Sequence, residues 1–180
     1  DKYQELEETA YINQVRVLRS FQHHRIRETH FQASSGYGYG DIGRDTLEMV
    51  YADIFHAESA LVRSQIVSGT HAISACLFAL LKPGDQLVSA VGSPYDTLKK
   101  VIGYEQHLPG SLTDRGIDYK EVPLNAEGKV NLPVLADYIT PQTRMVLIQR
   151  SRGYSRRPAV DMNTMKQMVT VIRSCNPNTI

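Results

Sequence analysis

Short apolar runs alternate with segments of helical spacing from residue 59 onward, and this alternation constrains the fold more than any other feature of the chain. The expected strands are residues 60–67, 86–91, 117–124 and 144–149. The expected helices are residues 70–81, 96–102, 132–139 and 163–173. Strands that alternate with helices predict an α/β fold with a mainly parallel sheet and helices on both faces. Ligands bind such sheets beyond the carboxyl ends of the strands, so the residues after each strand are the first candidates for a site.

The N-terminal part of the chain does not share this alternation. Residues 1–29 have a polar helical pattern with a narrow apolar stripe, which is typical of a helix that packs on another subunit. The stripe consists of Leu6, Ala10, Val15, Leu18 and either Phe21 or Gln22. Residues 31–43 are rich in glycine and serine and predict a loop. Asp45 can then cap a helix that ends near Phe55.

We therefore divide the chain into a helical arm with a glycine-rich loop, residues 1–58, and an α/β region, residues 59–180. The formal net charge is +1 with acids and bases interspersed, which gives no electrostatic reason to expect nucleic acid or an anionic membrane as a partner. Cys76 and Cys175 lie outside any metal or redox spacing, and we expect reduced thiols in a cytoplasmic protein. No apolar run reaches membrane-spanning length, and no signal peptide is expected.

The segment Ser68-Gly69-Thr70-His71 joins the first expected strand to the first expected helix of the α/β region. A glycine turn at a helix start points backbone N–H groups at an anion above it, and the helix dipole favours negative charge there. Thr70 adds a hydroxyl, and His71 either faces a bound ligand or stabilises the turn. The alternative is an ordinary helix N-cap with a tolerated glycine, which requires no ligand.

Tyr95 follows the second expected strand within Gly92-Ser93-Pro94-Tyr95, where the proline restricts Ser93 and stiffens the turn. An aromatic ring at this edge can cover a flat ligand, and its hydroxyl can move a proton. As an ordinary core or surface aromatic, Tyr95 would need no further explanation. A phosphate cradle at one strand end and an aromatic lid at the next suit a flat, phosphorylated cofactor. Pyridoxal phosphate is such a cofactor.

The same residues carry a resemblance to a known family. The turn that begins at Ser68 resembles the phosphate turn of the cysteine and methionine metabolism group of pyridoxal-phosphate enzymes. The longer run resembles the methionine gamma-lyase-like branch, often labelled aluminium resistance proteins. The matching blocks are Ser35-Gly36-Tyr37-Gly38-Tyr39, Gly43-Arg44-Asp45, Val62-Arg63, Ser68-Gly69-Thr70-His71-Ala72, Pro94-Tyr95-Asp96-Thr97-Leu98, Gly110-Ser111-Leu112 and Gln149-Arg150-Ser151-Arg152-Gly153-Tyr154. Blocks in this order are specific, and they cover nearly the whole chain.

The resemblance implies an aspartate aminotransferase-like (fold type I) large domain, of which residues 59–180 are the first, incomplete part. It implies pyridoxal phosphate as the cofactor and carbon–sulfur lyase activity on a sulfur-containing amino acid. It also implies a homo-oligomer, a dimer or tetramer, with shared active sites. The lysine that carries the cofactor and the aspartate that pairs with its pyridine nitrogen are expected after Ile180. We therefore expect the complete protein to be the lyase and this chain alone to be inactive.

The resemblance also implies roles for individual residues. The expected cofactor-binding residues are Ser68, Gly69, Thr70, His71, Tyr95, Tyr39, Arg44 and Ser151, and the expected catalytic residue is Tyr95. Tyr37 or Tyr39, together with Arg44, is expected to reach across a subunit interface to the neighbour's phosphate, for which arginine offers a planar clamp. Ser151 lies in the basic run of residues 150–157 after a buried strand. Such a run is usually a solvated face, but here we expect it near the cofactor or a substrate carboxylate.

Two alternative functions stay open at this point. One is another fold-type I pyridoxal-phosphate enzyme such as an aminotransferase, and the other is a non-catalytic fragment or interaction module. Gly38-Tyr39-Gly40-Asp41-Ile42-Gly43 matches the dinucleotide-binding fingerprint by its letters, but we reject it because no strand precedes it. No metal is expected, because His23, His24 and His30 have no carboxylate or cysteine in ligand spacing.

Overall fold

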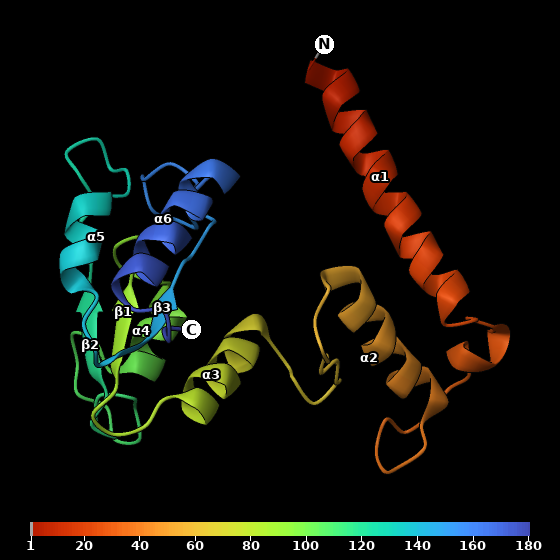
Figure 1. Ribbon diagram of the computed structural model, residues 1–180. Coiled ribbons are helices and arrows are strands. Elements are labelled where there is room, and N and C mark those ends of the chain that lie inside the picture. The colour runs from red at the N-terminus through yellow and green to blue at the C-terminus, as the bar shows by residue number, and fades with distance from the viewer. Residues whose placement is uncertain (1) are drawn as a thin grey trace. The chain divides into compact units, whose positions relative to one another are not determined.

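The computed structural model describes residues 2–180 and divides into two compact units, a first unit that ends at Val67 and a second unit, Ser68–Ile180 (Figure 1). The first unit contains two helices and a 3₁₀ turn. The second unit contains a small parallel sheet and four helices. None of the helices in the described part of the chain is long and apolar enough to cross a membrane.

The first unit consists of α1 (Lys2–His23), the turn η1 (Glu28–Phe31) and α2 (Ile42–Phe55). α2 contacts both other elements, and its Val50 is buried. The helix expected over residues 1–29 is therefore confirmed, although it ends at His23. Its apolar stripe stays largely in solvent, because Leu6 is 59% exposed and Leu18 is 50% exposed. The packing of this stripe on another subunit stays a prediction.

Asp41, and not the expected Asp45, caps α2. Asp41 has extended backbone angles, and its carboxylate accepts a hydrogen bond from the backbone N–H of Arg44 at 3.0 Å. This hydrogen bond and a second one from the Ser34 hydroxyl hold the pKa of Asp41 below its usual value. The helix therefore begins four residues earlier than expected, and Asp45 lies in its first turn, where it pairs with Arg44.

The strand expected at residues 60–67 is not formed. This segment is irregular, and two of its residues bind α2: the N–H of Val62 donates to Glu48 Oε1 at 3.0 Å, and Arg63 pairs with the same carboxylate. A strand needs a neighbouring strand for its backbone groups, and no strand described among residues 2–180 pairs with this segment. Val67 is 81% exposed, so its apolar character reflects no burial within the described chain.

The second unit is built on three parallel strands in the order β2-β1-β3 (Figure 1). The strands are β1 (Gln86–Ser89), β2 (Asp118–Glu121) and β3 (Thr143–Leu147). The helices are α3 (Gly69–Leu80), α4 (Asp96–Ile102), α5 (Leu132–Tyr138) and α6 (Met162–Cys175). All four helices and three of the four strands expected from the sequence are present. The predicted α/β architecture with a parallel sheet is therefore confirmed, with one strand fewer than expected.

Alternate residues of β1 point to opposite faces of the sheet. Both faces therefore carry apolar side chains, and helices cover both. Leu87 packs in a buried cluster with side chains of α3 and α4, and Val88 packs in another with side chains of α5 and α6. The buried members of the first cluster are Leu77, Leu81, Leu87, Leu98, Ile102, Leu112, Ile117 and Met145. β1 is buried along its whole length, as expected for a central strand covered on both faces.

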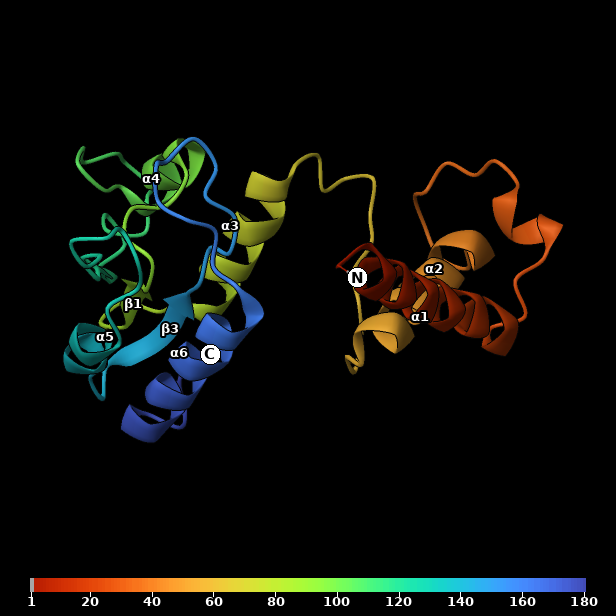
Figure 2. The ribbon, with the colours of Figure 1, turned by 90° about the horizontal axis from the view of Figure 1, so that it is seen from above.

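The outer edge of β3 already carries backbone pairing. The N–H of Ile180 donates to the carbonyl of Arg144, and the N–H of Val146 donates to the carbonyl of Ile180, both at 2.9 Å. Figures 1 and 2 show α6 next to β3, and Asn176 at the end of α6 donates its amide to the carbonyl of Thr143 at 3.2 Å. Ile180 therefore occupies the position of a strand beside β3.

Candidate functional site

The start of α3 is a helix N-terminus with unused backbone donors. Ser68 has extended backbone angles, and its hydroxyl accepts a hydrogen bond from the N–H of His71 at 3.1 Å. A helix cannot satisfy its first N–H groups internally, and no hydrogen bond recorded among residues 2–180 uses those of Gly69 and Thr70. A Cβ atom added at Gly69 would meet nothing within 4 Å, so the space at the helix start is open. The positive end of the helix dipole points into this space.

A hydrogen bond between two hydroxyls brings this helix start next to Tyr95. Thr70 Oγ1 lies 3.0 Å from Thr97 Oγ1, and Thr97 belongs to the first turn of α4. Tyr95 immediately precedes that helix. The sequence predicted the same proximity, but by a different route, because it placed the Ser68 turn at the end of a strand. The contact between α3 and α4 provides the proximity instead.

The loop after β3 holds Tyr95 from the other side. The Tyr95 hydroxyl lies 2.6 Å from Ser151 Oγ, and the N–H of Tyr95 donates to Gln149 Oε1 at 3.1 Å. Tyr95 is 36% exposed, so its side chain is accessible at this edge of the sheet. The structure thus brings together Thr70, Tyr95 and Ser151 of the expected site. Sequence reasoning missed Gln149, although its place directly after a buried strand was the signal that could have found it.

Arg157 is the other residue of this loop that the sequence did not single out. It is buried, whereas Arg150, Arg152 and Arg156 in the same basic run are exposed. Burial lowers the pKa of the Arg157 guanidinium, which stays protonated because arginine titrates far above neutral pH. The interpretation of the whole run as a solvated face therefore fails at this position.

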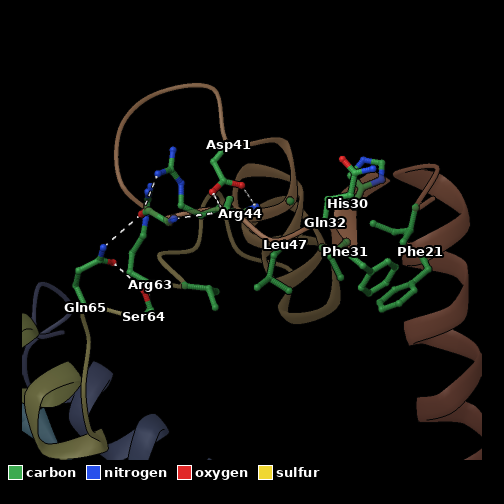
Figure 3. Close-up of a pocket in the computed structure, with 16 residues that line it drawn as sticks. Phe21, His30, Phe31, Gln32, Asp41, Arg44, Leu47, Arg63, Ser64 and Gln65 are labelled. Carbon is green, nitrogen blue, oxygen red and sulfur yellow. Dashed lines mark hydrogen bonds between the residues drawn. The ribbon is translucent and has the colours of Figure 1, made fainter. Parts of the chain in front are cut away.

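Arg44 lies in the first turn of α2 (Figure 3), and the two candidate tyrosines lie in the loop before this helix, all within the first unit. The Arg44 guanidinium donates to the carbonyls of Gly38 at 2.8 Å and Gly36 at 3.4 Å, and it pairs with Asp45 at 2.9 Å. Tyr37 and Tyr39 are fully exposed. Arg44 therefore stabilises the loop that precedes its helix, and this loop presents the tyrosines to solvent.

The same loop borders a cavity of about 330 Å³ within the first unit (Figure 3). Phe21, Phe31 and Leu47 give the cavity an apolar part, and Arg63 and Gln65 give it a polar rim. Gln65 Nε2 also donates to the carbonyl of Gly36 at 3.3 Å, so the rim braces the loop that carries the tyrosines. Residues 2–180 contain no cluster of three or more His, Cys, Asp or Glu side chains that could hold a metal ion.

Comparison with known proteins places the chain in a family. A family model described as methionine gamma-lyase matches residues 1–180. The Bacillus subtilis protein YnbB, described as uncharacterized, is 46% identical over 179 residues, which is 99% of this chain and 42% of YnbB. The chain thus spans less than half the length of this relative.

Solved structures agree over the whole chain. A Listeria monocytogenes protein, described as a candidate cystathionine beta-lyase involved in aluminium resistance, matches with a TM-score of 0.93 and 47% identity, over 98% of this chain and 45% of that one. A Clostridium novyi carbon–sulfur lyase involved in aluminium resistance matches with a TM-score of 0.90 and 44% identity, over 99% of this chain and 43% of that one. The structure of metB from Corynebacterium glutamicum shares the fold at 16% identity and a TM-score of 0.54, over 84% of this chain and 35% of that one.

Proposed function

The chain belongs to the methionine gamma-lyase family, and from this premise we propose that the complete protein is a pyridoxal-phosphate-dependent carbon–sulfur lyase that acts on a sulfur-containing amino acid. The observation that carries the proposal is the hydrogen bond between Thr70 and Thr97, which brings the open helix start of α3 next to Tyr95. A helix start open to an anion beside an accessible aromatic ring matches the two ends of this cofactor.

The start of α3 fits the phosphate group. The N–H groups of Gly69 and Thr70 are the unused donors of this helix, and open space lies above Gly69. The hydroxyls of Thr70 and Thr97 are hydrogen-bonded to each other at 3.0 Å, and the one that accepts in this pair keeps its own hydrogen to donate within the same small region. Hydrogen bonds to an ionised acceptor are about twice as strong as neutral ones. These residues would therefore bind a phosphate dianion and fix one end of the cofactor.

Tyr95 fits the ring of the cofactor. Its accessible side chain would stack on a flat pyridine ring and exclude water from one side of it. Pyridoxal phosphate, when bound, supplies an electron sink that stabilises negative charge at the alpha carbon of an amino acid. The Tyr95 hydroxyl can hold or release a proton at its Oη atom, and Ser151 Oγ at 2.6 Å can share that proton.

Product analysis on the complete protein tests the reaction. An elimination consumes one water and turns the sulfur amino acid into a thiol, ammonia and a 2-keto acid. We expect these three products in equal amounts from L-methionine or L-cystathionine, only when pyridoxal phosphate is present. Transfer of the amino group to an added keto acid, without release of thiol, would instead identify an aminotransferase. A complete protein that binds pyridoxal phosphate but converts no amino acid would favour the non-catalytic alternative.

We also propose a homo-oligomer in which the loop before α2 serves the neighbouring active site. The support is that Tyr37 and Tyr39 are exposed to solvent, while the side chains of Arg44 and Gln65 donate hydrogen bonds to backbone carbonyls of the loop. The exposed apolar side chains of α1 offer a surface for the partner. The contact of Arg44 with a neighbouring phosphate stays a prediction, because its guanidinium binds the carbonyls of Gly36 and Gly38 in this structure.

Subunit mixing tests the shared site. A Tyr39→Ala protein and a protein without the cofactor lysine should each be inactive, whereas an equal mixture should recover about a quarter of the wild-type sites, since half of the dimers are mixed and each has one intact site. Tyr37→Ala is the matched control in the same loop. Recovery with Tyr37→Ala instead of Tyr39→Ala would reassign the tyrosine. No recovery from either mixture, despite demonstrated subunit exchange, would rule out the shared site.

A further inference from the structure

The loop after β3 contains a buried positive charge without a carboxylate partner. Arg157 is 7% exposed, and no ion pair links it to an acidic side chain among residues 2–180. Burial of an unpaired charge is unfavourable unless strong hydrogen bonds compensate for it. The position of this arginine therefore demands a structural explanation that an exposed arginine would not.

Backbone carbonyls supply that compensation. Nη2 of Arg157 donates to the carbonyl of Gln149 at 2.8 Å and to that of Ser151 at 2.7 Å, and Nη1 donates to the carbonyl of Pro158 at 3.0 Å. One nitrogen thus fixes the backbone on both sides of Arg150. The planar, charged guanidinium is suited to such divided contacts, whereas a lysine ammonium acts as a single point of charge.

The residues that Arg157 fixes are the ones that contact Tyr95. Gln149 accepts the N–H of Tyr95 through its side chain, and Ser151 forms the hydrogen bond to the Tyr95 hydroxyl. Gly153, which has a φ of +57°, lies against the edge of the same ring: a Cβ atom there would be 2.3 Å from Tyr95 Cε1. The loop therefore constrains Tyr95 at its backbone, its ring edge and its hydroxyl.

We propose that Arg157 is the positioning residue for Tyr95. Through the carbonyls of Gln149 and Ser151 it sets the tilt of the ring and the direction of the hydroxyl hydrogen bond. The effect of this positioning on cofactor binding rests on the proposed function, but the positioning itself does not. No hydrogen bond joins Arg157 to Tyr95 among residues 2–180, but the guanidinium charge acts on Tyr95 through space. Arg157→Lys keeps a positive charge and loses the divided hydrogen bonds, so a shift of the Tyr95 signal in this variant reports on the positioning.

The test is carried out on the complete protein, labelled with ¹³C at the tyrosine Cζ atoms and without cofactor. The Tyr95 signal is the one that Tyr95→Phe removes. We expect Arg157→Met to shift this signal toward its position in Ser151→Ala, and Arg157→Lys to give an intermediate shift. Arg156→Met is the matched control, because Arg156 is exposed and adjacent in the sequence. It should leave the signal unchanged.

Affinity for pyridoxal phosphate is then measured on the same proteins. We expect the dissociation constant to rise about tenfold in Arg157→Met, which corresponds to the loss of about one hydrogen bond's contribution, and to change less than about twofold in Arg156→Met. The midpoint of thermal unfolding shows whether Arg157→Met still folds. If it does not, Ser151→Ala and Arg157→Lys serve in its place.

The outcomes separate the two proposals. An unchanged Tyr95 signal in Arg157→Met would overturn the positioning role even if the wild-type protein binds the cofactor. If Arg157→Met fails to fold, an unchanged Tyr95 signal in both Arg157→Lys and Ser151→Ala would overturn it instead. If Arg157→Met shifts the Tyr95 signal but the wild-type protein binds no pyridoxal phosphate, the positioning role stands and the proposed function is contradicted. A shifted signal together with weaker cofactor binding supports both.

Discussion

Replacement of Ser68 by aspartate is expected to weaken binding of pyridoxal phosphate by the complete protein about 100-fold or more, whereas replacement by asparagine should have little effect. Both substitutes can accept the hydrogen bond from the N–H of His71 that Ser68 Oγ now accepts at 3.1 Å, and both are good N-cap residues. Only aspartate adds a negative charge at the point where the phosphate dianion would bind. Repulsion of about 3 kcal/mol at a few ångströms corresponds to that loss of affinity.

The comparison with asparagine separates charge from capping. The midpoint of thermal unfolding without cofactor should be similar for the two variants, because α3 stays capped in both. Pyridoxal, which has no phosphate, should bind both variants with equal affinity. Equal binding of pyridoxal phosphate by Ser68→Asp and Ser68→Asn would show that its phosphate lies elsewhere.

Replacement of Leu87 by alanine is expected to lower the free energy of unfolding of the α/β unit by about 2–5 kcal/mol. Leu87 is completely buried in the central strand, between helices α3 and α4 and the core residues Leu112 and Met145. Its truncation removes apolar contacts and leaves a cavity in a rigid environment that cannot collapse fully. Denaturant unfolding of the complete protein, followed by far-ultraviolet circular dichroism, measures the loss.

Leu87→Met is the matched control, because it preserves most of the side-chain volume. We expect it to lower the free energy of unfolding by less than about 1.5 kcal/mol. If both variants unfold at the wild-type denaturant concentration, β1 does not form the centre of the core, and the sheet order on which the site depends would need revision.

Hydrophobic periodicity was sufficient to predict most of the second unit. α4 coincides with its expected range, and the other three helices deviate from theirs by at most two residues at either end. These elements bury one apolar face against the sheet, so the spacing of their apolar residues records their environment directly. Tyr95 and Ser151 were predicted as site residues for the same reason, because each follows a strand of the sheet.

The failures concern residues whose structure depends on distant partners. Residues 60–67 have the composition of a buried strand, but the N–H of Val62 and the guanidinium of Arg63 bind Glu48 of α2. Local spacing in the sequence cannot reveal these contacts. Asp41 and Asp45 are equally good caps by residue type, and the hydrogen bond to the N–H of Arg44 decides between them. Arg157 looks like its exposed neighbours in sequence, and only the carbonyls that converge on it show that it is buried.

A crystal structure of the complete protein with pyridoxal phosphate would show whether the cofactor lies at the start of α3. We expect phosphate oxygens within hydrogen-bond distance of the N–H groups of Gly69 and Thr70, and the pyridine ring stacked on Tyr95. The Tyr95 hydroxyl should still bind Ser151. A phosphate bound away from the start of α3, or a ring that makes no contact with Tyr95, would contradict the account.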